Sequence, residues 1–202
     1  LREKDILVIA SKIVAIDEGR FIADSRRKGE LVENESDHII KAIVPDGWDI
    51  TVKNGMIAFA GGIDESNIGG GLLLLPEDPN ASARRIWEQL RQKFGISELG
   101  IIITDSGPLP YREGVVALSI GHAGIEPVIS HVGNNDLFGR PFACTKVDAV
   151  DAIAAAAGFA MGETDQSTPL CLVRDVPHIA FTDEDRSSDL RIEATKDIYY
   201  PL

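Results

Sequence analysis

The stretch LLLLPEDPNASARRIWEQLRQKFGISELGIIITD, residues 72–105, carries the pattern that decides the fold. After a first apolar run, Asp78 and Pro79 suit the N-cap and first position of a helix, and Gly95 suits its end. A second apolar run then ends on Asp105. Strand, helix and strand in succession predict a crossover unit, so the fold class is α/β. Because ligands gather outside the carboxyl ends of such strands, Asp105 lies at a candidate site.

The segments on either side predict further strands and helices. DILVIASKIVA (residues 5–15) is a buried-strand run, and ELVENESDHIIKAIV (residues 30–44) has mostly helical spacing. In WDITVKNGMIAFAGG (residues 48–62), two β-rich runs flank Asn54 and Gly55, which predicts a hairpin with a two-residue turn.

The second half of the chain continues the alternation. GVVALSIG (residues 114–121) predicts a strand, and TKVDAVDAIAAAAGFAMG (residues 145–162) predicts a helix with small residues that allow close packing. TPLCLVRDV (residues 168–176) predicts a last buried strand, and the charged residues 183–202 predict an exposed tail. We therefore expect residues 1–202 to form a single domain unit.

Composition narrows the class of protein. The chain has 202 residues, 44% hydrophobic, with 20 Lys and Arg against 32 Asp and Glu, a formal net charge of −12. A nucleic acid would approach against that field, so small molecules are the expected partners. Without an apolar run of roughly 20 residues or a leader peptide, the chain predicts a cytoplasmic protein away from membranes. Cys144 and Cys171 lie in apolar stretches and predict buried, reduced thiols.

Four groups of polar residues could carry chemistry. They are Ser11 with Lys12; Asp64, Glu65, Ser66 and Asn67 in a glycine-rich loop; Asp105 and Ser106 with Tyr111 and Arg112; and Asp136, Arg140 and Thr145. Carboxylate and hydroxyl oxygens on strand ends and loops suit Mg²⁺ or Mn²⁺. No His and Cys spacing matches a zinc site, and neither a P-loop nor a GxGxxG motif follows a strand.

Each group also has a purely structural interpretation. Asp105 could cap a turn, Asp136 could form an Asx-turn, and the pair Ser11 and Lys12 could be a solvated strand end. Arg112 could pair with a surface carboxylate. The glycine-rich loop could be a mobile surface loop, although its glycines also suit close backbone approach to a phosphate.

Several blocks of the sequence, taken in order, resemble one enzyme family. They are ILVIASKIVAIDEGR, AGGIDESN, LLPEDPNASARRI, IIITD, REG, SIGHAG, NNDLFGRPFACTKVDAVDAIAAAA, MGE and PLCLVR. The family is that of the coenzyme F420-0:L-glutamate ligases, or gamma-glutamyl ligases. The resemblance implies an α/β mixed-sheet protein, an intertwined homodimer, and an amide-forming ligase. This ligase would add L-glutamate to a carboxylate of a deazaflavin precursor, with GTP as co-substrate and Mg²⁺ or Mn²⁺ as cofactor.

Carried over position by position, the resemblance implies roles for the candidate residues. Asp105 and Arg112 would be catalytic, and Asp105, Asp136 and Thr145 would hold the metal. The implied nucleotide contacts are Ser11, Lys12, Asp64, Ser66 and Asn67. The chemistry is coherent, because phosphorylating a carboxylate supplies it with a leaving group. We accordingly expect Asp105 and Asp136 to share one cation, and the loop of residues 61–71 to be shaped by ligand binding.

The chain departs from the family pattern at particular positions. Leu109 stands where an Arg is usual, Lys146 where an acidic residue is common, Ile16 where a second Lys is usual, and Ala117 where an Asp is common. The chain also begins almost inside a strand, so we expect the upstream segment of the family to be absent. These changes bear on substrate and activity rather than on the fold.

Three functions compete. The first is a ligase of this family or a close paralogue acting on a different acid or amine. The second is a non-catalytic protein that binds a nucleotide or metal, and the third is another phosphoryl-handling enzyme. Lys146 distinguishes these functions. If its ammonium takes the place of the metal cation, nucleotide affinity should depend little on Mn²⁺. In the homodimer, we expect the hairpin at Asn54 and Gly55 or the alanine-rich helix to form the interface.

Overall fold

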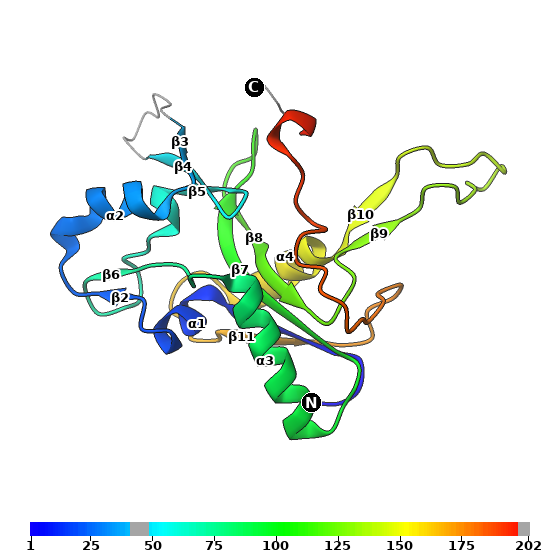
Figure 1. Cartoon of the computed structure of the whole chain (residues 1–202), viewed down its shortest axis with the longest axis horizontal. Helices are drawn as coiled ribbons and strands as arrows, with labels where there is room; N and C mark the ends of the chain where they lie inside the picture. Colours follow the sequence, from blue (N-terminus) through cyan, green and yellow to red (C-terminus); the bar gives the residue numbers. More distant parts are fainter. Residues whose placement is uncertain (41–48, 198–202) are drawn as a thin grey trace.

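The computed structural model describes residues 1–40 and 49–197, and its centre is a four-stranded mixed sheet (Figure 1). The strand order is β11-β1-β7-β8, from β1 (Asp5–Ala10), β7 (Leu99–Pro108), β8 (Val115–Ala123) and β11 (Leu170–Val173). β1 and β7 are parallel, and the other two pairings are antiparallel. The predicted α/β class with a mixed sheet is confirmed.

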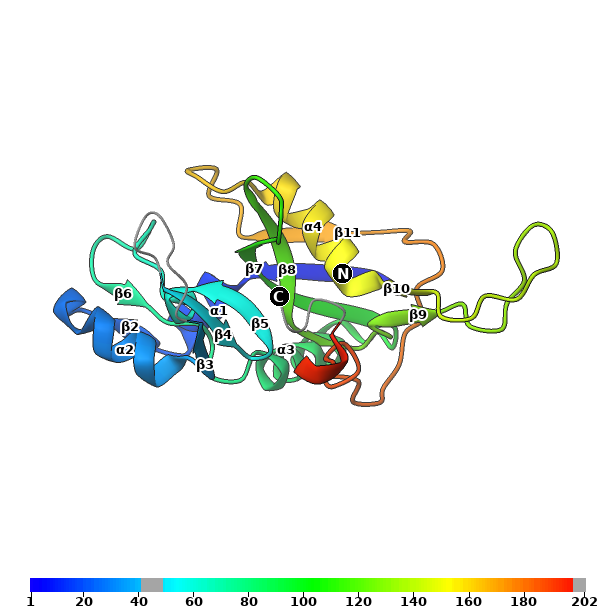
Figure 2. The same cartoon turned by 90° about the horizontal axis from the view of Figure 1, so that it is seen from above.

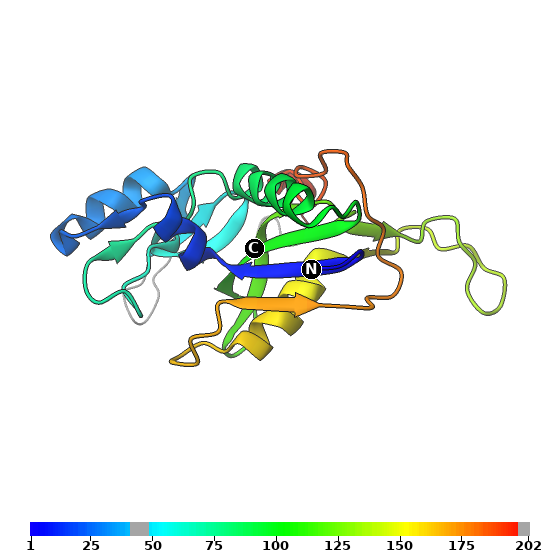
Figure 3. The same ribbon diagram turned by 90° about the horizontal axis from the view of Figure 1, so that it is seen from below.

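Two helices cover opposite faces of this sheet, α3 (Pro79–Phe94) on one and α4 (Ala149–Met161) on the other (Figure 3). The strands alternate between them: Ile101 and Ile103 pack under α3, whereas Ile102 packs under α4. On α4, small residues such as Ala154 are buried against the sheet. The small residues on this face of α4 thus pack in the protein's own core, and the subunit contact through this helix stays a prediction.

The caps of α3 follow the sequence prediction. Asp78 accepts hydrogen bonds from the backbone amides of Asn80 and Ala81, Pro79 occupies the first turn, and Gly95 is left-handed at φ 64°. The buried face centres on Trp87, whose Nε1 donates to the carbonyl of Leu99 at 2.8 Å. Phe94, the last residue of the helix, is exposed.

Three predicted strands differ from the structure. The run at residues 5–15 is a strand only to Ala10, and α1 (Ser11–Asp17) follows directly. The run at residues 72–75 contributes only β6 (Leu72–Leu73), which pairs with β2 (Phe21–Ile22) outside the main sheet. The parallel neighbour of β7 is β1. β11 is an edge strand whose side chains alternate between exposed and half-buried, rather than a buried strand.

A smaller lobe lies beside the end of the main sheet at which α1 begins (Figures 1 and 2). It contains η1 (Ser25–Arg27), α2 (Lys28–Glu35), η2 (Ala60–Gly62) and a three-stranded sheet of β3 (His38–Ile40), β4 (Ile50–Lys53) and β5 (Met56–Phe59). The hairpin prediction is confirmed, because Asn54 and Gly55 join β4 and β5 with positive φ. The helix predicted over residues 30–44 is wrong beyond Glu35, and its residues 41–44 lie outside the described residues.

At the opposite end, β9 (Val128–Ser130) and β10 (Lys146–Asp148) form the base of a long hairpin arm that extends away from the body (Figures 1 and 2). Val147 lies on β10 rather than in the predicted helix, which begins after its N-cap Asp148. Cys144 is exposed on this arm and Cys171 is half-buried, so the predicted buried thiol is wrong for Cys144.

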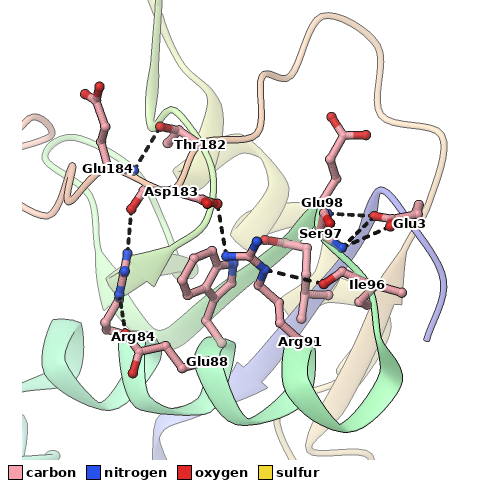
Figure 4. A network of polar contacts seen from close by, with 12 residues as sticks. Glu3, Arg84, Glu88, Arg91, Ile96, Ser97, Glu98, Thr182, Asp183 and Glu184 are labelled. Atoms are coloured by element: carbon pink, nitrogen blue, oxygen red, sulfur yellow. Dashed lines mark hydrogen bonds and ion pairs between the residues drawn. The ribbon is translucent and has the colours of Figure 1, made fainter.

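The last described segment, residues 183–197, is mostly exposed but is attached to α3 (Figure 4). Arg91 Nη1 lies 3.0 Å from Asp183 Oδ1, and Arg84 Nη1 donates to the Asp183 carbonyl at 2.9 Å. The segment contains η3 (Ala194–Lys196). None of the helices within residues 1–40 and 49–197 is long and apolar enough to cross a membrane.

Candidate functional site

The site begins where β1 ends and α1 starts. β1 and β7 are parallel, and Ala10 lies opposite Thr104. The residues that follow, Ser11 after Ala10 and Asp105 after Thr104, therefore lie beside each other. Ser11 Oγ donates a hydrogen bond to Asp105 Oδ1 at 2.8 Å, although 94 residues separate them. The parallel pairing therefore brings together two of the residues that the sequence suggested.

The sequence predicted that Asp105 ends its strand, but β7 continues to Pro108 because it still pairs with β8. It still lies beyond the carboxyl end of β1, where one edge of β7 has no β1 partner. Burial raises the pKa of the Asp105 carboxyl to about 6, and the nearby Asp64 carboxylate adds to the rise, while the Ser11 hydrogen bond opposes it. Such a carboxylate is stabilised by any cation that approaches it.

Lys12 connects this strand end to the glycine-rich loop. Its Nζ lies 2.6 Å from Asp64 Oδ2 and 2.9 Å from Ser66 Oγ, and Asp64 Oδ1 accepts from the Ser66 amide at 2.6 Å. Burial alone would raise the pKa of Asp64, but the hydrogen bonds from Lys12 and Ser66 hold it below its ordinary value. Lys12, Asp64 and Ser66 thus form one charged cluster beside Asp105.

The glycine-rich loop has a structural basis that the sequence did not predict. Its base is closed by mutual backbone hydrogen bonds of 2.9 Å between Asp64 and Leu73. A Cβ at Gly62 would meet the side chain of Leu75, and one at Gly71 would lie 2.6 Å from the Ile22 carbonyl. Both glycines also have positive φ. The packing of the loop itself therefore requires these two glycines, and the shaping of the loop by a ligand stays a prediction.

A cavity of about 510 Å³ opens beside this cluster. Lys12 and Asp105 border it on one side, and the loop between α4 and β11, residues 162–169, borders it on the other. Asn67 lies at the junction, where its Nδ2 donates to the Thr164 carbonyl at 3.0 Å. The lining combines carboxylates with an apolar wall that includes Ile13, Ile16, Ile68, Ala117 and Met161.

The loop after α4 was not predicted from the sequence to be part of the site. Ser106 Oγ donates to Glu163 Oε1 at 2.6 Å, which places a further carboxylate on the cavity wall. The block MGE, which ends on Glu163, was part of the family resemblance, but nothing in its spacing connected it to β7. Only the tertiary contact reveals it.

Three predicted site residues lie elsewhere in this chain. Asp136 and Thr145 are on the arm, which extends away from the main sheet on the side opposite the carboxyl end of β1 in all three views (Figures 1, 2 and 3). Asp136 Oδ1 accepts from the amides of Phe138 and Arg140 at 2.8 and 2.9 Å, which is the Asx-turn alternative. Arg112 is exposed on the turn between β7 and β8. One chain alone therefore does not assemble the predicted metal set of Asp105, Asp136 and Thr145.

The donor atoms near Asp105 nevertheless suit a hard cation. The Asp105 and Asp64 carboxylates are close enough to interact, and two hydroxyls, Ser11 and Ser66, lie beside them. Within residues 1–40 and 49–197, no three His, Cys, Asp or Glu side chains gather into a metal-binding group. Mg²⁺ commonly uses one or two carboxylates, with phosphate oxygens and water as its other ligands, so the residues fit a cation that arrives with a nucleotide.

Comparison with known proteins identifies the family. The family model described as F420-0:Gamma-glutamyl ligase matches residues 1–175. The chain belongs to the F420-0:gamma-glutamyl ligase family. The coenzyme F420:L-glutamate ligase of Methanopyrus kandleri is 35% identical over 193 residues, which cover 86% of this chain and 76% of that protein. The protein of the same name from Methanothermobacter thermautotrophicus is 36% identical over 199 residues, covering 88% and 77%.

A third relative, the coenzyme F420:L-glutamate ligase of Haloarcula marismortui, is 33% identical, and the match covers 98% of this chain and 84% of that protein. The match to the gamma-glutamyl ligase family includes β1, the glycine-rich loop, β7 and α4, and therefore all the residues that border the cavity.

Proposed function

We propose that this chain is a GTP-dependent and divalent-metal-dependent ligase that adds L-glutamate to the carboxylate of a deazaflavin coenzyme precursor. The observation that carries the proposal is the cluster of Ser11, Lys12, Asp64 and Asp105 in a chain of the gamma-glutamyl ligase family. Ser11, Lys12 and Asp105 of this cluster border the cavity of about 510 Å³. The cavity would hold the triphosphate of the nucleotide and the carboxylate that receives the phosphoryl group.

The residues have distinct roles in this proposal. The Lys12 ammonium, held by Asp64 and Ser66, would face the phosphates as a fixed positive charge. Asp105 and Asp64 would hold Mg²⁺ or Mn²⁺, which when bound offsets the negative charge of the phosphoryl group. The Ser11 hydroxyl keeps the Asp105 carboxylate in place. The apolar wall excludes water from the activated carboxylate, whose hydrolysis would otherwise compete with amide formation.

We further propose that the protein acts as a homodimer in which the arm of one subunit completes the cavity of the other. At the tip of the arm, Leu137 is 99% exposed and Phe138 is 88% exposed. Exposed apolar side chains on an extended hairpin favour docking on another protein surface. Docking on a second copy would bring the Asp136 and Thr145 of one subunit to the Asp105 of the other.

One observation favours a family member with an altered substrate. Ile16 and Ala117 line the cavity at positions where the family resemblance implied a Lys and an Asp. A substrate group that would contact the Lys and the Asp in other family members would contact apolar side chains in this chain. A non-catalytic binding protein is the remaining alternative, and turnover separates it from both ligases.

The test is a turnover assay with purified protein, GTP, Mn²⁺, L-glutamate and F420-0, in which GDP and the amide product are measured together. The proposed function predicts stoichiometric GDP and product, both lost when the metal is chelated or when either co-substrate is omitted. GTP binding without turnover would support the binding protein. Turnover only with another acid or amine would support the paralogue.

A further inference from the structure

The inference concerns Glu163 and rests on the proposed function. Glu163 directly follows the C-cap of α4, Gly162, and is exposed, and its Oε1 accepts from Ser106 Oγ at 2.6 Å. Ser106 is the residue after Asp105, but 57 positions separate it from Glu163. The hydrogen bond therefore fixes a carboxylate of the loop after α4 against the same strand that carries Asp105.

Asp105 and Ser106 present their side chains to opposite faces of β7, because consecutive residues of a strand alternate. Both nevertheless border the cavity, which lies along the edge of β7 beyond the end of β1. The cluster around Asp105 thus approaches the cavity from the α1 side, and Glu163 approaches it from the α4 side. A substrate lying across this edge of β7 would meet both.

The charges on the two sides differ. On the α1 side, the Lys12 ammonium accompanies the carboxylates of Asp64 and Asp105. On the α4 side, the charged residues that border the cavity within the described chain are Glu163 and Asp165, both acidic. Carboxylates repel phosphate and attract an ammonium group. The α4 side therefore suits the amine rather than the nucleotide.

We propose that Glu163 binds the α-amino group of the incoming amino acid and accepts its proton. The ammonium transfers one proton to the Glu163 carboxylate, and the freed nitrogen lone pair attacks the carbonyl carbon of the acyl phosphate. A C–N bond forms, the bond from that carbon to the phosphate oxygen breaks, and phosphate leaves with the electron pair. The second nitrogen proton leaves with the phosphate, so the products are the amide, hydrogen phosphate and protonated Glu163. Ser106 is a positioning residue that orients this carboxylate.

The experiment compares two nucleophiles. L-Glutamate carries an ammonium that needs a base, whereas hydroxylamine is largely unprotonated at neutral pH and captures an acyl phosphate as a hydroxamate without one. Both are measured with GTP, Mn²⁺ and F420-0 for the wild-type protein, Glu163→Gln, and the control Glu33→Gln, which neutralises an exposed carboxylate on α2. The melting temperature of each variant establishes that it is folded.

We expect Glu163→Gln to lower the rate with L-glutamate by about 100-fold or more, as for a lost general base, and to retain the hydroxamate rate within about threefold. Glu33→Gln should match the wild type with both nucleophiles. An equal loss with both nucleophiles would assign Glu163 to metal or nucleotide binding and overturn the inference, as would an unchanged rate with L-glutamate. If the wild type forms neither product, the proposed function fails, and the inference with it.

Discussion

Replacing Asp64 with Asn tests whether the glycine-rich loop serves binding or folding. The ion pair of Asp64 with Lys12 spans 2.6 Å between side chains that are 33% and 30% exposed. A partly exposed pair of this kind contributes about 0.2–1 kcal/mol to stability. An Asn Oδ1 can still accept from the Ser66 amide, and the backbone bonds to Leu73 do not involve the side chain. We therefore expect Asp64→Asn to lower the free energy of unfolding by about 1 kcal/mol or less.

Binding should respond far more strongly than stability. Asp64 supplies one of the two carboxylates beside Ser11 and also orients Lys12, so its neutralisation should weaken binding of GTP with Mn²⁺ by about 10- to 100-fold. Calorimetric titration gives the affinity, and urea denaturation gives the stability. Glu65→Gln is the matched control, because Glu65 pairs with Lys28 at 2.8 Å from the same loop and is 52% exposed. The affinity of Glu65→Gln for GTP should equal that of the wild type.

Two outcomes would contradict this argument. If Asp64→Asn costs several kcal/mol while the affinity per folded molecule is unchanged, the loop is purely structural. If Glu65→Gln weakens GTP binding as much as Asp64→Asn does, the effect is the general loss of loop charge rather than the cluster around Lys12.

Three further predictions concern stability, pH and assembly. Trp87→Phe should lower the free energy of unfolding by about 2–4 kcal/mol in urea titrations, because it leaves the Leu99 carbonyl without its donor and weakens stacking by Arg84 and Arg91, 4.3 and 4.1 Å from the ring; a loss below about 0.5 kcal/mol would refute it. With the metal removed by a chelator, the pKa of Asp105 is about 6 in the folded chain and 3.8 in the unfolded chain. The free energy of unfolding of the wild type should therefore fall as pH rises from 3.8 to about 6 and level off above that. Asp105→Asn should remove about 2–3 kcal/mol of that fall, and an identical pH profile would contradict the assignment. Finally, the variants Asp105→Asn and Asp136→Asn should each be inactive alone. When the two are refolded together, activity should recover, because one of the two cavities of a mixed dimer contains both aspartates. A mixture that stays inactive would place Asp136 outside the site.

Local signals in the sequence predicted the elements whose ends are set by single residues. Two examples are the turn at Asn54 and Gly55 and the caps of α3 at Asp78 and Gly95. Each was predicted because it depends only on the backbone conformation and side chain of the residues at that position. The extent of β1 was not predictable in this way. Its last strand residue, Ala10, is followed by a helix of largely apolar residues, which give the same signal as a buried strand.

Long-range pairing accounts for the other errors. The run at residues 72–75 is as apolar as a central strand, yet its partner is β2, and no local feature distinguishes that pairing from one with β7. For the same reason, sequence analysis identified Asp105 and Ser11 separately but could not place them 2.8 Å apart. Glu163 was missed entirely, because its connection to Ser106 exists only in the folded chain.

The position of the cavity follows from the unequal lengths of β1 and β7. β1 ends at Ala10 because the chain turns into α1, whereas β7 continues to Pro108 because β8 still pairs with it on the other side. The edge of β7 beyond Thr104 is therefore free of β1, and successive side chains there reach both faces of the sheet. In the proposed ligase, this arrangement would let one short segment present Asp105 to the phosphates and Ser106, through Glu163, to the amine. A chain in which β1 continued for two more residues would pair along this edge and could not bring the two groups to one substrate.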